Sequence, residues 1–193
     1  MGILNPGGNP SAWPGAFWLS LCGLALLGAG DLRAESGYSP VEAGVKASYL
    51  WNFAKYTQWP AGAFASSTAP IVIGVLGDDP FGGVLDATLA NRSSQGRKVL
   101  IRRARGVQAL RDCQVVFISR SEQARLPAIL ATLGQAPVVT VCDADALFEQ
   151  GVMIKLSLAG ETVRFEVKLA PAERAGLKFG SGMLSAAKRI WPK

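Results

Sequence analysis

Histidine is absent from the 193 residues of the sequence, and cysteine occurs only three times. Without histidine, the chain lacks the base of Ser–His–Asp and Cys–His catalytic sites, the usual general base near neutral pH, and the commonest zinc ligand. No other nucleophile–base pair stands out. The sequence therefore predicts that the protein is not an enzyme and that it holds no metal and no cofactor.

A concentrated basic segment is also lacking, although the formal net charge is +6. The basic residues are scattered, and their densest group, Arg97–Arg105, lies around a predicted strand. There is no long basic helix and no basic stripe interleaved with aromatic residues, which argues against nucleic-acid binding. The net charge favours acidic partners or an anionic membrane surface.

The apolar run Ala16–Ala29 is shorter than the about 20 residues that a membrane-spanning helix needs. Small Ala34 stands before Glu35, as at the cleavage site of a secretory signal peptide. No Lys or Arg precedes the run, which is atypical, and a leader retained as a membrane anchor is the alternative. We expect a cleaved signal peptide over residues 1–34, a single α/β domain over residues 35–193, and export of that domain.

Beyond this leader, the cysteines are Cys113 and Cys142. The compartment of an exported protein oxidises thiols, which favours a disulfide. However, Cys113 begins one predicted strand and Cys142 ends the next, so parallel strands would place them at opposite ends of the sheet, on the order of 15 Å apart. A disulfide needs Cα atoms within about 7 Å. We therefore predict two free, largely buried thiols.

Ser39 and Pro40 mark the start of a helix predicted to run to about Thr57, because serine is a favoured N-cap and proline is favoured at the first helical position. Small and apolar residues recur every three or four positions and define a buried face. Further apolar side chains leave little polar circumference: Val45, Tyr49, Trp51 and Tyr56. Such a helix is either buried on most sides or supplies an interface.

Strand and helix patterns alternate in the next part of the chain. Apolar runs typical of strands covered on both faces occupy residues 71–76, 99–101, 113–119 and 137–142. Between them we expect helices, one with Asp79 as its N-cap and one capped by Ser121 and ended by Gly134. Alternation at this spacing implies right-handed crossovers and a parallel sheet.

Period-2 alternation replaces this pattern after Gly151. Two alternating runs, 152–157 and 163–169, flank Ala159-Gly160 and predict a hairpin with one solvated face. The segment 171–192 is helical in outline but broken by glycines. The predicted fold class is α/β: a three-layer sandwich around a mostly parallel sheet, with an antiparallel C-terminal hairpin at the edge.

A glycine-rich turn, Gly74–Gly83, follows the first of these strands, where phosphate sites form in α/β proteins. It lacks both the P-loop lysine and a G-x-G-x-x-G pattern, so a tight turn is predicted instead. Asp78, Asp79 and Asp143 lie at predicted carboxyl ends of strands, where α/β ligands bind. They are candidates for holding a cation, but aspartate is also the ordinary residue of turns and caps, which we favour.

Several blocks together resemble the YfiR family of periplasmic proteins. The first block, ending at Trp59-Pro60, and the Gly-Asp-Asp-Pro-Phe turn carry most of the specificity. The blocks occur in order over essentially the whole predicted domain: Val45–Pro60, Ile73–Phe81, Cys113–Ser119, Val163–Val167 and Ala175–Lys178. The chain departs from the family at Lys168, where asparagine is common, and at Gly180 and Gly182, which replace a more serine-rich and basic segment.

The resemblance implies a repressor that holds a membrane-bound diguanylate cyclase inactive through the periplasmic part of the enzyme. It thereby restrains cyclic-di-GMP production and biofilm formation. It also implies an outer-membrane lipoprotein partner that relieves the repression. Whether the protein forms a homodimer is left open by the resemblance. Disulfide-based redox control, associated with some members, is not supported by two cysteines.

We predict a partner-binding surface made of aromatic and charged residues, because aromatic residues and arginine commonly anchor interfaces. Its members are Tyr49, Phe53, Trp59, Glu166, Lys168, Arg174 and Lys178. A place in the core is the alternative for the aromatic residues. The alternative function is a periplasmic small-molecule receptor that binds at the carboxyl ends of the strands, and a hydrolytic enzyme is a third, weaker alternative.

Overall fold

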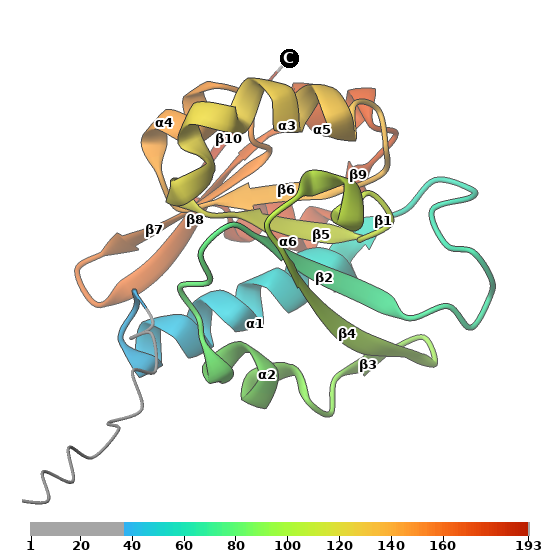
Figure 1. Ribbon diagram of the computed structural model, residues 1–193, viewed down its shortest axis with the longest axis horizontal. Helices are drawn as coiled ribbons and strands as arrows, with labels where there is room; N and C mark the ends of the chain where they lie inside the picture. Colours follow the sequence, from blue (N-terminus) through green and yellow to red (C-terminus); the bar gives the residue numbers. More distant parts are fainter. Residues whose placement is uncertain (1–36, 193) are drawn as a thin grey trace, which may run out of the picture. The chain divides into compact units, whose positions relative to one another are not determined.

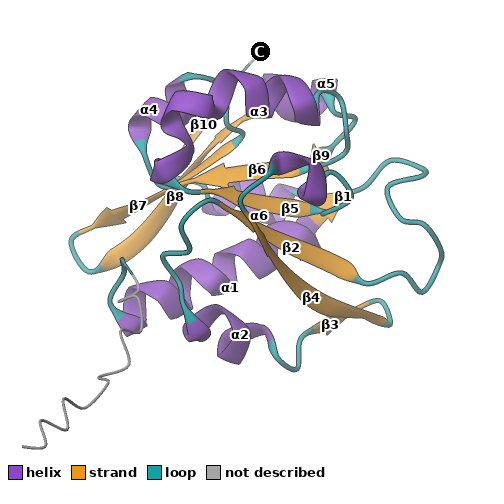
Figure 2. Cartoon of the chain, viewed as in Figure 1, coloured by secondary structure: helices purple, strands orange, loops and turns teal. Residues whose placement is uncertain are grey.

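The computed structural model describes residues 37–192. Two layers of helices enclose a mixed β-sheet, as Figures 1 and 2 show. The helical elements are α1 (Pro40–Tyr56), α2 (Gly83–Leu89), η1 (Val107–Leu110), η2 (Arg120–Arg125), α3 (Leu126–Leu133), α4 (Asp145–Glu149), α5 (Leu169–Arg174) and α6 (Ser181–Ala186). The strands are β1 (Thr57–Gln58), β2 (Ile71–Leu76), β3 (Ser93–Ser94), β4 (Arg97–Ala104), β5 (Val115–Ile118), β6 (Val139–Cys142), β7 (Ile154–Ala159), β8 (Thr162–Lys168), β9 (Lys178–Phe179) and β10 (Arg189–Trp191).

The main sheet has the order β10-β8-β7-β6-β5-β2-β4-β3. Its centre, from β4 to β7, is parallel, and β7 and β8 form an antiparallel hairpin. β2 lies between β4 and β5, so the chain first proceeds to one side of β2 and then returns to the other. This is the arrangement of a doubly wound α/β domain, and it confirms the predicted fold class. The edge beyond the hairpin is completed by β10, which pairs in parallel with β8.

Alternate residues of the central strands face two separate cores. Ile73 and Phe117 pack with α1 and α2 on one face, whereas Val72 and Val116 pack with η1, α3 and α4 on the other. Gly74 allows the second layer to approach the sheet closely, because a Cβ there would lie 3.0 Å from Leu110 Cδ2. All six residues of β2 are buried, as its uninterrupted apolar run predicted.

The start of α1 follows local sequence rules. Pro40 is its first residue, and the Ser39 hydroxyl accepts a hydrogen bond from the Glu42 backbone N–H at 3.2 Å. The predicted N-cap is therefore confirmed. α1 is buried along Ala43, Ala47 and Leu50, as its spacing predicted.

Three local expectations are wrong. α2 begins at Gly83 with Gly82 as its cap, because the Asp79 carboxylate instead accepts from the Phe81 N–H within the preceding turn. Ser121 lies inside η2, and its hydroxyl accepts from the Asp78 N–H. The segment after Pro171, predicted as helical in outline, contains two short helices and two short strands.

Both cysteines beyond the predicted leader are free and buried. β5 and β6 are parallel, as the argument about their separation assumed. Burial raises the pKa of the Cys113 thiol to about 11 and that of Cys142 to about 12. These thiols are therefore almost entirely protonated near neutral pH, which disfavours redox chemistry at either one.

Candidate functional site

Tyr49 and Phe53, two of the predicted partner-binding residues, lie between α1 and β8. Phe53 is 1% exposed, and its ring centroid lies 5.1 Å from that of Phe165. Tyr49 is half-buried beside it, and its hydroxyl donates to the Val163 carbonyl at 3.3 Å. Phe53 therefore belongs to the hydrophobic core and presents no side-chain surface to a partner in this fold.

Glu166 and Lys168, two further predicted residues, lie on β8 beneath two aromatic rings. Glu166 is buried and accepts hydrogen bonds from Lys155 Nζ at 2.9 Å and Trp191 Nε1 at 3.1 Å. Burial alone would raise the pKa of Glu166, but these two donors outweigh it and lower the pKa. Lys168 donates to the Phe148 carbonyl at 2.6 Å. The expected solvated face of the hairpin is thus partly covered, because Trp191 from β10 and Phe148 from α4 contact it.

Trp59 and Lys178 come together at the C-terminal end of α1. β1 and β9 pair there, with Gln58 opposite Lys178. Trp59 borders a groove of about 530 Å³, which we call the aromatic–basic groove. Its lining comprises Lys55, Tyr56, Thr57, Gln58, Trp59, Pro60, Phe64, Gln95, Arg97 and Gly180.

Rings and cations alternate in the aromatic–basic groove. Trp59 meets Phe64 edge-on with ring centroids 6.0 Å apart, and the Arg97 guanidinium lies 4.0 Å from the Phe64 centroid. Tyr56 is 45% exposed. The lining contains two cations, Lys55 and Arg97, and no carboxylate. Such a surface is suited to a partner segment that offers apolar and acidic side chains.

The seven predicted residues therefore do not form one site. Tyr49 and Phe53 lie in or beside the core, Glu166 and Lys168 near β10, and Trp59 and Lys178 at the aromatic–basic groove. Arg174 is exposed on α5 and does not line that groove. What separates them is the packing of the helical layers, which the sequence pattern does not specify.

A second hollow, the switch-point cleft, opens at the carboxyl ends of β5 and β6. It has a volume of about 280 Å³ and is lined by Gly37, Tyr38, Glu42, Pro80, Phe117, Ser119, Arg120 and Asp143. The chain reverses its direction of travel across the sheet between β2 and β5, and ligands of doubly wound proteins bind at such a point. The sequence placed Asp143 at this edge correctly.

Asp143 is the centre of a buried polar network in this cleft. Its carboxylate side chain is 4% exposed and accepts from Tyr38 Oη at 2.6 Å, Lys46 Nζ at 3.3 Å and Arg120 Nε at 3.1 Å. Burial raises the pKa of Asp143, but these hydrogen bonds and charges outweigh it, so the pKa lies below its ordinary value. Asp143 therefore stays ionised in the folded chain.

Lys46 carries this network into α1. It is 2% exposed, and its ammonium lies 2.8 Å from Glu42 Oε1 and 3.6 Å from the centroid of the Tyr38 ring. Sequence reasoning did not single out Lys46, Tyr38 or Arg120. The sequence feature that could have indicated Lys46 is its position as a charged residue on the predicted buried face of the helix, which Ala43, Ala47 and Leu50 define.

Asp78 and Asp79, the other acidic candidates, are paired with arginines. Asp78 Oδ1 lies 2.7 Å from Arg105 Nη1, and Asp79 Oδ2 lies 2.6 Å from Arg103 Nε. Asp79 also closes the local turn through its bond with Phe81. The use of Asp79 in a turn agrees with the interpretation favoured from the sequence.

These observations define a doubly wound α/β domain with a buried ion network at its switch point and an aromatic–basic groove at the opposite end of α1. The YfiR/HmsC-like family profile matches residues 43–188, which cover most of the chain, so the chain belongs to this family. Members of this family include periplasmic regulators of diguanylate cyclases.

Two solved structures are similar to part of this chain. A conserved domain protein from Vibrio cholerae is 13% identical over 62% of this chain and 54% of its own, with a TM-score of 0.49. An ABC domain from Streptococcus pneumonia, solved in complex with L-Trp, is 11% identical over 62% of this chain and 55% of its own, with a TM-score of 0.46. The chain thus spans about half the length of these structures. No protein with a curated description matches it by sequence.

The predicted signal peptide, residues 1–34, lies outside the described residues. Within residues 37–192, no helix is long and apolar enough to cross a membrane.

Proposed function

We propose that this chain represses a membrane-bound diguanylate cyclase by binding the periplasmic part of the enzyme. Repression lowers cyclic-di-GMP and biofilm formation, and the chain itself catalyses no reaction. The match of the YfiR/HmsC-like family over residues 43–188 is the observation that carries this proposal. A periplasmic location and release of repression by an outer-membrane lipoprotein are part of the same proposal.

The aromatic–basic groove is the surface that we propose for the cyclase. It holds exposed ring surface at Tyr56, cations at Lys55 and Arg97, and no carboxylate in its lining. Lys178 adds a further exposed cation beside it through the pairing of β9 with β1. Apolar contact at the centre with charges around it is the usual composition of a protein interface.

The test uses a strain that lacks this protein and is complemented with variants, with intracellular cyclic-di-GMP as the readout. The double variant Lys55→Glu/Lys178→Glu reverses two exposed charges and leaves the core intact. Arg164→Glu, an exposed charge reversal on β8, is the matched control. We expect wild type and control to restore low cyclic-di-GMP and the double variant to fail.

Two outcomes separate the parts of this proposal. Unchanged cyclic-di-GMP on removal of the protein would overturn repression itself. Full repression by the double variant, at equal protein level in immunoblots, would overturn the groove alone. Mass spectrometry of partners retained from solubilised membranes then identifies the cyclase, and size-exclusion chromatography with light scattering determines whether the chain forms a homodimer.

A small-molecule receptor is the second candidate function, favoured by the position of the switch-point cleft. Arg120 borders it with a side chain that is 68% exposed, and Ser119 lies at the end of β5. The measurement is a thermal-shift screen of small metabolites with wild type and Arg120→Gln. A saturable shift that Arg120→Gln abolishes supports the cleft, and a shift that Arg120→Gln leaves intact excludes it.

A further inference from the structure

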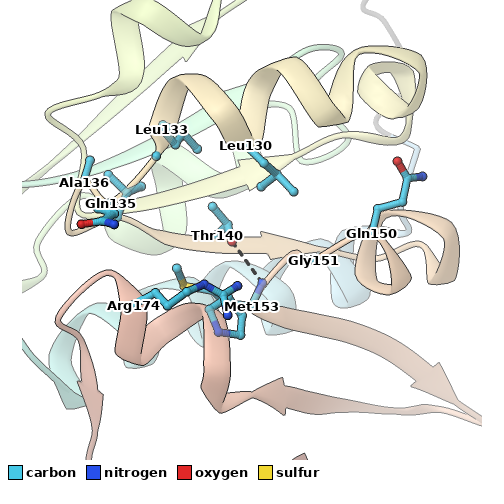
Figure 3. A pocket seen from close by; sticks show the side chains of 12 residues that line it. Leu130, Leu133, Gln135, Ala136, Thr140, Gln150, Gly151, Met153 and Arg174 are labelled. Atoms are coloured by element: carbon cyan, nitrogen blue, oxygen red, sulfur yellow. Dashed lines mark hydrogen bonds between the residues drawn. The ribbon is translucent and has the colours of Figure 1, made fainter. Parts of the chain in front are cut away.

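A third hollow lies between α3 and α5 (Figure 3). We call it the α3–α5 pocket. It has a volume of about 280 Å³ and is lined by Leu130, Leu133, Gly134, Gln135, Ala136, Val138, Thr140, Gln150, Gly151, Met153, Pro171 and Arg174. Ligand sites commonly measure about 300–1,000 Å³, so this pocket suits a small molecule.

The pocket exists because β6 and β7 pair over only two residues. Their ladder joins Val141 to Ile154 and Cys142 to Lys155, and it does not continue toward Thr140. There the Thr140 hydroxyl accepts from the Met153 N–H at 3.0 Å, the contact drawn in Figure 3. A side-chain bond thus replaces the next step of the ladder, and the space above it stays open beneath α3.

Apolar side chains form part of the wall of the pocket. In Figure 3, Leu130 and Leu133 descend from α3, and Met153 lies below them. Pro171 also lines the pocket. Gly151 adopts a φ of +120°, and a Cβ there would meet Leu130 Cδ1 at 3.4 Å. A residue with a side chain at this position would be strained and would narrow the pocket. The wall is therefore shaped by a backbone conformation that favours glycine.

The polar groups of the pocket include one cation and no anion. Arg174 projects from α5 and, within residues 37–192, has no ion pair or side-chain hydrogen bond. The side-chain amide nitrogen of Gln150 donates to the Ala146 carbonyl at 3.0 Å. Glu149 and Glu173, acidic neighbours in sequence, do not line the pocket. A guanidinium beside an apolar cavity is suited to a carboxylate, which it can bind with two hydrogen bonds.

We propose that the α3–α5 pocket binds a small apolar carboxylate, with its hydrocarbon body against Leu130, Leu133 and Met153 and its carboxylate on Arg174. The same chemistry occurs in a free organic acid and in the C-terminal apolar residue of a peptide. The pocket shares no lining residue with the aromatic–basic groove or the switch-point cleft, so this proposal does not depend on the proposed function.

The test is isothermal titration of the purified protein with 4-phenylbutyrate as the probe. We expect saturable one-to-one binding with a dissociation constant of about 1 mM, as ligand efficiency allows for a molecule of this size. 4-Phenylbutanol, which lacks the charge, and the variant Arg174→Gln should each bind about tenfold more weakly. Arg111→Gln, an exposed arginine that does not line the pocket, should bind as wild type does.

A second variant tests the cavity rather than the charge. Ala136→Leu extends a lining side chain into the pocket and should abolish binding, while an unchanged circular-dichroism melt shows that the fold is retained. Equal binding of phenylbutyrate to wild type and Arg174→Gln would overturn the proposal, as would the absence of saturable binding at 10-fold the expected dissociation constant. A tripeptide ending in phenylalanine separates the two sources. If the tripeptide with a free C-terminus binds more tightly than phenylbutyrate, and C-terminal amidation abolishes this binding, the pocket is assigned to a chain terminus. If the tripeptide binds more weakly than phenylbutyrate, the pocket is assigned to a free organic acid.

Discussion

Replacing Asp143 by asparagine probes the polar network that joins α1 to the carboxyl end of β6. The substitution keeps the size of the side chain and one oxygen acceptor for Tyr38, but it removes the charge opposite Lys46 and Arg120. Breaking a buried ion pair by removing one partner costs about 3–5 kcal/mol. Because Glu42 still pairs with Lys46 at 2.8 Å, we expect a smaller loss for Asp143→Asn, about 2–3 kcal/mol.

The assay is thermal and urea unfolding of the purified protein, followed by circular dichroism. For a domain of this size, the expected loss lowers the melting temperature by about 5–10 °C. Asp145→Asn is the matched control, because its side chain is 79% exposed and its bond with Lys155 lies at the surface. Exposed pairs contribute about 0.5 kcal/mol, so the control should melt close to wild type.

The pH dependence distinguishes a charge effect from a packing effect. The pKa of Asp143 is lower in the folded chain than in the unfolded chain, so its contribution is complete above the unfolded pKa, near 4, and is lost as pH falls through the folded pKa. The deficit of Asp143→Asn should be equal at pH 7 and pH 5 and smaller at pH 3. A variant as stable as wild type at pH 7, or a deficit unchanged at pH 3, would refute this account.

Three further outcomes follow from buried groups elsewhere. Phe53→Ala should cost about 3–5 kcal/mol in urea unfolding, because the ring is fully enclosed between α1 and β8. Gln114→Ala should cost about 1–3 kcal/mol, because the side chain oxygen accepts from the buried Val72 N–H at 2.8 Å and alanine leaves that donor without a partner. At pH 7.5, a maleimide should leave Cys113 and Cys142 unlabelled in the native protein and label both in urea, because burial raises the pKa of each thiol.

Each of these experiments has its own control and its own contrary result. Asn52→Ala, an exposed neighbour on α1, and Gln108→Ala, exposed on η1, should stay within about 0.5 kcal/mol of wild type. A loss below about 1 kcal/mol for Phe53→Ala would place that ring at the surface. Peptide mapping that finds native labelling of either cysteine at the rate of a free thiol would contradict its burial.

Much of the fold could be predicted because its signals are local. The Ser39-Pro40 start of α1 depends on contacts within one helical turn, and β2 is an apolar run that requires cover on both faces. One of the errors occurred where a side chain had a distant partner. The Ser121 hydroxyl serves the N–H of Asp78, 43 residues away, and so could not be assigned as a cap from its neighbours in sequence.

The candidate site was less predictable than the fold. Asp143 was expected at the carboxyl edge of the sheet because parallel strands end there together. Its partners come from three separate segments, and nothing in the local pattern at Lys46 or Arg120 indicates that they converge on it. The predicted partner-binding residues were chosen by type, and packing assigned Phe53 to the core while it left Trp59 beside the aromatic–basic groove.

By itself, the sequence determined the parallel α/β architecture, the separation of the two cysteines and the likeness to the YfiR family, because periodicity, strand direction and motif order are properties of the chain. The tertiary structure alone decided which charges are buried and which cavities stay open. Burial of Lys46 against Asp143, and the space left beneath α3 where the β6–β7 ladder ends, depend on contacts between segments far apart in the chain. Those contacts form only when the helical layers close over the sheet.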